Sequence, residues 1–376
     1  MQKMSSKYTL LVWVLAALFV TACSTQPRRA NHDAPASQVA DGHAQAAHDK
    51  ASQKQGVNDA EVAGKAIVEP EPIDSNLSPE LLFRLMVAEI SGQRGHLNVA
   101  VKQYLEAAKI SHDPKVIERA ARIAVYARDT QSAMEAADLW TDIAPESIEA
   151  HQVAAAMNLR SGNITQAHIH FEKVIDLSTQ KGTRNTFMLI TSLLGKESDK
   201  QAALDVMEQL VSTRQDNPEA LYAYSQLALL VGELDKAKQS ALKVIKLKPD
   251  WADAYILYSN TLYRQGKKVK ALNELEFALN KVPDNIHLRD YYARRLVDEK
   301  RYEEAREQFK IVLETAPGNA DAAYALALLS LQTNKLDEAN KLFQNLVKSG
   351  KRIHESSYYL GQIAEEQGNT SLAVQW

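Results

Sequence analysis

Residues 251–283 read WADAYILYSNTLYRQGKKVKALNELEFALNKVP, and this stretch decides the fold. Its apolar residues recur in steps of three and four, which places them on one face of a helix. A glycine, Gly266, separates two such runs, and Pro283 follows the second. Glycine accepts the positive φ of a tight turn, and proline cannot continue a helix. We therefore expect a first helix, a short turn and a second helix.

The same pattern returns along the chain at a nearly constant interval. Nine alanines mark it, with intervals of 33, 34, 36, 34, 34, 34, 34 and 34 residues: Ala100, Ala133, Ala167, Ala203, Ala237, Ala271, Ala305, Ala339 and Ala373. A period near 34 is typical of stacked helical hairpins, which present surfaces to partners. We expect neighbouring helices to approach closely at each alanine, where a bulkier side chain would cost roughly 1–3 kcal/mol.

Glycine marks the expected turn, and proline the repeat boundary, in most copies of the pattern. Glycines stand at the expected turns as Gly95, Gly162, Gly232, Gly266 and Gly368, and prolines at the repeat boundaries as Pro114, Pro145, Pro218, Pro249, Pro283 and Pro317. Repeats two and four depart from the pattern. Repeat two has Arg128-Asp129-Thr130 at its turn, and repeat four has an extended ending.

This spacing and residue pattern resembles the tetratricopeptide repeat from about residue 79 to the end. The resemblance implies an all-α fold, a right-handed α-α superhelix of about nine repeats over residues 79–376. A helical array of another family, such as half-a-tetratricopeptide repeats, is the alternative, and it too is a solenoid. Trp376 lies three residues after Ala373, so the ninth repeat is incomplete and we expect the parent protein to continue.

The first residues predict an export signal. Lys3 and Lys7 precede an apolar run of 13 residues, 8–20, which is the length of a signal-peptide core. The run ends in Val20-Thr21-Ala22-Cys23. This resembles the bacterial lipobox, which implies that residues 1–22 are removed and that palmitate and further acyl chains anchor Cys23. An ordinary cleaved signal peptide with a chance cysteine is the alternative.

The resemblance also implies a location. Ser24 follows the cysteine in place of an aspartate that would signal retention at the inner membrane. We therefore expect anchoring in the outer membrane, facing the periplasm. Residues 23–78 are rich in Ala, Gln, Asp, His and Ser. Such a composition predicts a disordered tether, spanning on the order of 40 Å.

Catalytic and metal-binding motifs are weak in this sequence. We therefore expect a protein that is not an enzyme and that has no cofactor and no metal site. Ser240 and Lys243 match the Ser-x-x-Lys motif of penicillin-recognising enzymes, but they lie inside a repeat helix without partner motifs. His168 and His170 are two apart on a helix and therefore point in different directions. Lys and Arg number 44 against 47 acidic residues, with no basic stripe, which argues against nucleic acid.

The candidate binding residues lie on the first helices, which line the concave face of a tetratricopeptide solenoid. Matching each repeat to that pattern predicts Tyr222, Gln226, Ile256, Asn260, Tyr263, Asp290, Arg294, Tyr324, Leu328 and Tyr358. Their mixture of Tyr, Asn and Arg suits an extended peptide. Of the residues that make a carboxylate clamp for chaperone tails, only Asn260 fits.

The first repeat carries a narrower resemblance. It reads PELLFRLMVAEISGQRG over residues 79–95, YLEAA over 104–108 and DPKVIERAARIA over 113–124. This resembles the opening of gammaproteobacterial lipoproteins that bind a periplasmic carboxyl-terminal processing protease. The resemblance implies an adaptor for that protease and for peptidoglycan hydrolases, with no small-molecule substrate. A pilotin-like or barrel-assembly-like lipoprotein is the alternative.

Overall fold

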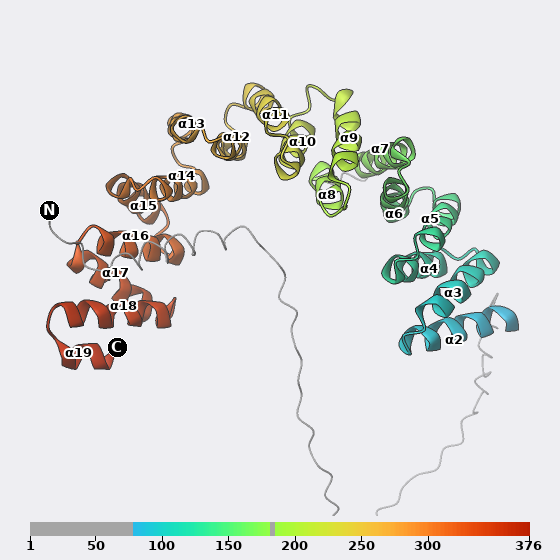
Figure 1. Cartoon of the computed structure of the whole chain (residues 1–376), viewed down its shortest axis with the longest axis horizontal. Helices are drawn as coiled ribbons and strands as arrows, with labels where there is room; N and C mark the ends of the chain where they lie inside the picture. The colour runs from blue at the N-terminus through green and yellow to red at the C-terminus, as the bar shows by residue number, and fades with distance from the viewer. Residues whose placement is uncertain (1–77, 181–184) are drawn as a thin grey trace, which may run out of the picture. The chain divides into compact units, whose positions relative to one another are not determined.

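The computed structural model describes residues 78–180 and 185–376, and there every regular element is one of 18 α-helices. They form nine hairpins, each with a first and a second helix (Figure 1). The first helices are α2 Pro79–Gln93, α4 Pro114–Ala127, α6 Ile148–Arg160, α8 Thr186–Leu194, α10 Pro218–Val231, α12 Ala252–Arg264, α14 Ile286–Asp298, α16 Ala320–Gln332 and α18 Ile353–Glu366. The second helices are α3 Leu97–Ser111, α5 Thr130–Ile143, α7 Ile164–Gln180, α9 Lys200–Ser212, α11 Leu234–Leu247, α13 Lys268–Lys281, α15 Tyr302–Thr315, α17 Leu336–Lys348 and α19 Thr370–Gln375.

This is the all-α tetratricopeptide solenoid that the repeat predicts. The leader over residues 1–22, Cys23 and all of the tether up to residue 77 lie outside the described residues.

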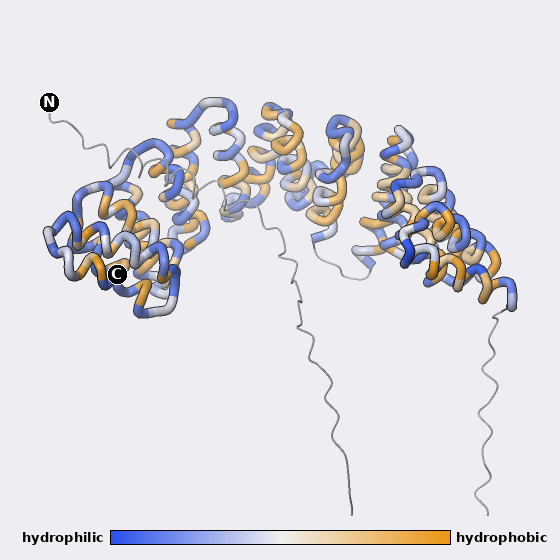
Figure 2. The backbone as a smooth tube through the Cα atoms, turned by 60° about the horizontal axis from the view of Figure 1, so that its bottom comes forward, coloured by the Kyte–Doolittle hydropathy of each residue, from blue (hydrophilic) through white to orange (hydrophobic). Residues whose placement is uncertain are grey.

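Nearly every helix packs mainly against its neighbours in the chain, so contacts are local. First helices of adjacent repeats also touch, α8 with α10, α10 with α12, and α12 with α14. We call the surface that the first helices present along the array the first-helix face. Apolar and polar residues are intermixed along the helical array in Figure 2, as expected when one side of most helices is buried against its neighbours.

The nine alanines occupy one structural position. Each is the fourth residue of a second helix. Its N–H donates to the carbonyl of the residue that caps that helix, as Ala271 does to Lys267 at 3.0 Å. The first eight alanines are fully buried, whereas Ala373 is only half-buried. The first turn of each second helix is therefore the point of closest packing.

A small residue faces the alanine from the first helix, twelve positions earlier. It is Ser225 and Ser259 in repeats five and six, and both side chains are completely buried. The Ser225 hydroxyl donates to the Ala237 carbonyl at 2.8 Å, and the Ser259 hydroxyl donates to the Ala271 carbonyl at 3.2 Å. This close helix approach explains why the repeat tolerates only small side chains at both positions.

Eight of the nine turns before a second helix contain a residue in the left-handed conformation, which glycine adopts most easily; the turn of repeat four contains none. Five turns use the predicted glycines, whose φ values range from 75° to 101°. Repeat two, which lacks the glycine, places Arg128 in the same conformation with φ 58°. Lys300 and Asn334 do so in repeats seven and eight. Repeats two, seven and eight therefore keep the left-handed turn and place another residue in it.

Repeat four is the irregular copy. The helix before it, α7, has 17 residues, and its own first helix, α8, has 9. Residues 181–184, which connect these helices, are not among the residues that the structure describes. The extra residues in the alanine spacing therefore fall at the boundary between repeats three and four.

Charged side chains tie adjacent repeats together. Arg306 is almost fully buried and pairs with Glu303 and with Glu338 of the next repeat. Glu338 also accepts a hydrogen bond from Ser330 at 2.9 Å. Removing one member of such a buried network leaves a charge without its partner, which is more costly than losing an exposed pair.

We expect Ala271→Leu to lower the free energy of unfolding by roughly 1–3 kcal/mol, because the added side chain has no room at the helix contact. Urea unfolding followed by circular dichroism measures this. Ala373→Leu is the matched control: its position is the same but half-buried, so its cost should be smaller. Equal midpoints for wild type and Ala271→Leu would contradict the close contact.

Candidate functional site

The ten predicted residues all lie on first helices. Tyr222 and Gln226 come from α10, Ile256, Asn260 and Tyr263 from α12, Asp290 and Arg294 from α14, Tyr324 and Leu328 from α16, and Tyr358 from α18. Their environments differ enough to divide the set into surface and core residues.

Tyr222 is half-buried against the next repeat. Its ring stacks on Trp251 with centroids 4.7 Å apart. Burial raises the pKa of Tyr222 to about 12, helped by the negative charge of Asp253 and opposed by a hydrogen bond with Gln226. The hydroxyl therefore stays protonated at neutral pH and remains available as a donor and acceptor.

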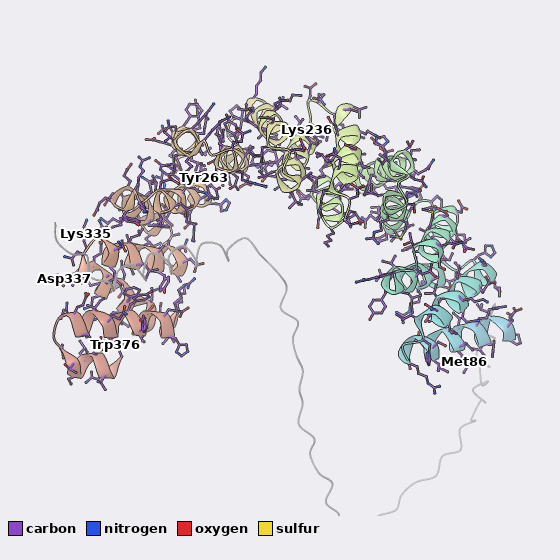
Figure 3. All side chains as sticks on the ribbon, viewed as in Figure 1. Met86, Lys236, Tyr263, Lys335, Asp337 and Trp376 are labelled. Carbon is purple, nitrogen blue, oxygen red and sulfur yellow. The ribbon has the colours of Figure 1, made fainter. Side chains whose placement is uncertain are left out.

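Asn260 and Tyr263 hold repeats six and seven together. The Asn260 side-chain oxygen accepts hydrogen bonds from the Tyr291 hydroxyl at 2.8 Å and from Arg295 at 2.9 Å. The Arg295 guanidinium lies 4.8 Å from the centre of the Tyr263 ring, which Figure 3 labels, and 4.9 Å from that of Tyr291. Cation–π contacts of this kind rigidify the junction. The Asn260 amide nitrogen takes no part in these bonds.

Ile256, Asp290 and Arg294 are also half-buried. Ile256 packs on the apolar core of repeats six to eight. Asp290 and Arg294 form an ion pair within α14, with nitrogen and oxygen 2.7 Å apart. Their charges balance, so this part of the first-helix face is polar without a net charge.

The structure corrects the prediction for Tyr324 and Leu328, which lie in the core with 6% and 2% of their surfaces exposed. Tyr324 packs edge-on against Phe343 and Tyr359, at centroid distances of 5.9 and 6.3 Å. Side chains of their own repeat and of the next one enclose both residues, so they are not accessible to a partner. Tyr358 is the opposite case, because 61% of it is exposed.

Two basic residues on this face were missed by the sequence prediction. Lys248 pairs with Glu219 at 2.5 Å and lies 5.2 Å from the ring centre of Trp251. Arg352 pairs in the same way with Asp321 at 2.6 Å and lies 4.7 Å from the Tyr324 ring centre. Both lie between a second helix and the next first helix, whereas the candidate residues were predicted from positions inside the first helices. An acid at the second position of the preceding first helix is the signal that could have found them.

The residues considered for catalysis are engaged elsewhere. Ser240 is 4% exposed, and its hydroxyl donates to the Leu221 carbonyl at 2.8 Å. Lys243 donates to Gln215 instead of approaching the serine. The Ser240 hydroxyl is thus a structural bond between the two helices of repeat five.

The two histidines considered as a metal pair have different neighbours. His168 contacts Glu172 at 3.3 Å, whereas His170 meets His151 with the two Nδ1 atoms 3.0 Å apart. His151 Nε2 lies 3.0 Å from the Pro145 carbonyl, so Nε2 carries the proton and Nδ1 accepts one from His170. Among residues 78–180 and 185–376, no group of three or more acidic, histidine or cysteine side chains has the arrangement of a metal site.

Within the same ranges, no helix is both long enough and apolar enough to pass through a bilayer. The apolar run of residues 8–20 lies outside them.

Family comparisons agree with this geometry. Tetratricopeptide-repeat family models match residues 218–250 and 296–354, which cover repeats five, seven and eight in part or whole. These matches and the helical hairpins support a tetratricopeptide-repeat protein.

Three relatives share partial similarity with the chain. It is 29% identical over 237 residues to TPR repeat-containing protein PA4667 of Pseudomonas aeruginosa, covering 63% of this chain and 39% of the relative. It is 23% identical to a DnaJ homolog subfamily C member 7 homolog of Schizosaccharomyces pombe, covering 65% of this chain and 57% of the relative. It is 22% identical to mitochondrial import receptor subunit TOM70 of Homo sapiens, covering 60% and 39%. The chain therefore matches less than two-thirds of each relative.

Among solved structures, yeast Tom70 is similar with a TM-score of 0.40 and 12% identity, covering 78% of this chain and 90% of that structure. The similarity is too low to add to the fold or to the function.

The histidine pair predicts a pH-dependent stability. Burial, and then the charge of His151, lowers the pKa of His170 below its ordinary value of 6.5. At pH values between 6.5 and the lowered pKa of His170 in the folded state, the unfolded chain binds more protons than the folded chain. The free energy of unfolding therefore falls as the pH falls through this window. Urea unfolding at several pH values across this window measures the slope.

We expect His170→Asn to flatten that slope, because asparagine does not titrate. The exposed His287 provides the control, and His287→Gln should leave the slope nearly as in wild type. A slope that is the same in wild type and His170→Asn would show that the pair is not its source.

Proposed function

We propose that this chain is a non-catalytic adaptor on the periplasmic side of the outer membrane. A lipid on Cys23 would anchor it, and the first-helix face would bind a periplasmic carboxyl-terminal processing protease and its peptidoglycan-hydrolase substrates. The lipobox resemblance and the first-repeat resemblance support the location and the partners. The observation that carries the binding role is the first-helix face, where Tyr222, Asn260 and Tyr358 present aromatic and amide groups on a rigid scaffold.

The mechanism would be effective concentration. A protease and a substrate held on one solenoid meet as parts of a single complex, so their encounter no longer depends on diffusion through the periplasm. Such a scaffold needs rigid, separate binding regions and no reactive group of its own. The repeat supplies them, because each hairpin depends mainly on its nearest neighbours.

Affinity capture from a detergent-solubilised envelope, followed by mass spectrometry, tests the proposal. Retrieval of the protease together with a hydrolase supports it. Retrieval of secretin or barrel-assembly components instead would favour the assembly-factor alternative. Cys23→Ser should abolish incorporation of labelled palmitate, and acylation that persists in this variant would contradict the anchor.

We expect Tyr222→Ala combined with Tyr358→Ala to weaken capture of the partner by about tenfold or more, because tyrosines are among the residue types that contribute most to binding interfaces. Biolayer interferometry with the captured partner measures this. Circular dichroism should show unchanged helicity, since neither side chain is fully buried. Tyr324→Ala is the contrast: it removes a core ring and should lower stability first.

A further inference from the structure

A cavity of about 330 Å³ opens between repeats one and two, away from the residues discussed above. Its lining comes from α2, α3 and α4 and comprises Glu89, Gly92, Gln93, Leu97, Tyr104, Arg119, Arg122, Ile123 and Tyr126. Met86, labelled in Figure 3, marks the helix α2 that forms one wall. The size is at the lower end of ligand pockets and suits one or two side chains.

A glycine, Gly92, lies in the wall of the cavity. Gly92 lies eight positions before the repeat alanine, a position where most other repeats have a bulky side chain: Val125, Leu159, Leu229, Tyr263, Val297 and Leu331. A Cβ at Gly92 would meet the Ile123 Cδ1 atom at 3.4 Å, at the wall of the cavity. Repeat one thus has no side chain at this position, and Ile123 of repeat two is the neighbour that lies over it.

Repeat four also has a glycine at this position, Gly195, and it shows which kind of side chain can lie over such a glycine. A Cβ at Gly195 would meet the Leu230 Cδ2 atom of repeat five at 3.1 Å. A leucine from the next repeat therefore occupies the space over this glycine. The residue of repeat two that corresponds to Leu230 is Tyr126, which is 76% exposed and lines the cavity without filling it.

The charged residues at the rim of the cavity restrict which ligands can bind. Arg119 and Arg122 face the cavity with 56% and 66% of their side chains exposed, against one lining acid, Glu89. Glu89 is already engaged by Arg119 and by the Tyr104 hydroxyl. Arg122 pairs only along its own helix, with Glu118 at 2.6 Å, and such an exposed pair is weak. Two arginines and one acid thus line the cavity, and the carboxylate that offsets Arg122 is Glu118, which lies outside the lining.

We propose that this cavity is a binding site for a branched aliphatic side chain, leucine for preference, that stands beside a carboxylate in a partner's peptide segment. The aliphatic group takes the space that Leu230 takes over Gly195, and Arg122 binds the carboxylate. The carboxylate can belong to an acidic side chain or to the end of a chain. The site adds a partner chemistry to the proposed adaptor role and rests on that role only for the source of the peptide.

Methyl NMR of the full chain, labelled at isoleucine Cδ1, tests the site without any partner. The probe is N-acetyl-Leu-Asp-amide, titrated to millimolar concentration, and the Ile123 resonance is assigned with Ile123→Val. We expect a saturable shift of the Ile123 signal. N-acetyl-Leu-Asn-amide and N-acetyl-Ala-Asp-amide should each bind about fivefold more weakly or worse, having lost the charge or the aliphatic group. N-acetyl-leucine, with a free carboxylate, tests the chain end as the source.

Two variants complete the test. Gly92→Leu puts the repeat's usual side chain into the cavity and should abolish the shift while leaving the helix at least as stable, because leucine favours helix over glycine. Tyr126→Leu copies repeat five and should weaken the shift. No Ile123 shift with any probe, or an undiminished shift in Gly92→Leu, would overturn the site. Neither result would bear on capture of a protease through Tyr222 and Tyr358, which lie in repeats five and nine.

Discussion

The first turn of each second helix is where two helix backbones come closest, and the rest of the solenoid depends on it. The buried alanine there binds the carbonyl of the helix cap, and a small residue faces it from the first helix. In repeats five and six the facing residue, Ser225 or Ser259, adds a hydrogen bond across the contact. Because neither side can grow, both positions are restricted in size in every repeat, and the period becomes visible in the sequence.

This constraint explains which parts of the fold could be predicted. The alanine spacing and the turn glycines follow from backbone geometry within one hairpin, so the sequence carries them directly. Arg128 shows that even a missing glycine changes little, since the capping contacts of the hairpin hold a non-glycine residue at φ 58°. The interval of 36 residues before Ala203 was visible in the sequence, but the prediction of an extended ending for repeat four was wrong: the extra residues come before it, with a long α7 and a short α8.

The candidate face was less predictable because exposure is decided by the next repeat. Tyr222 and Tyr324 occupy the same position in their helices. Phe343 and Tyr359 pack around Tyr324, which is buried, whereas Tyr222 stacks on Trp251 and stays half-buried. Matching a repeat pattern assigns both to the surface. The basic residues before the first helices, such as Lys248, were missed for a related reason: Lys248 is held by Glu219 of the preceding first helix and by Trp251 at the start of the next one.

Recognition in such an array has to come from positions that the close helix contact does not restrict. The position of Gly92 is one of them, since the repeats have glycine, valine, leucine, tyrosine or glutamate there. Because each hairpin interacts mainly with its neighbours, a ligand between repeats one and two should not disturb side chains such as Tyr358 in repeat nine. An adaptor needs this property: two binding regions that share a scaffold but do not compete, so that occupancy of one leaves the other free.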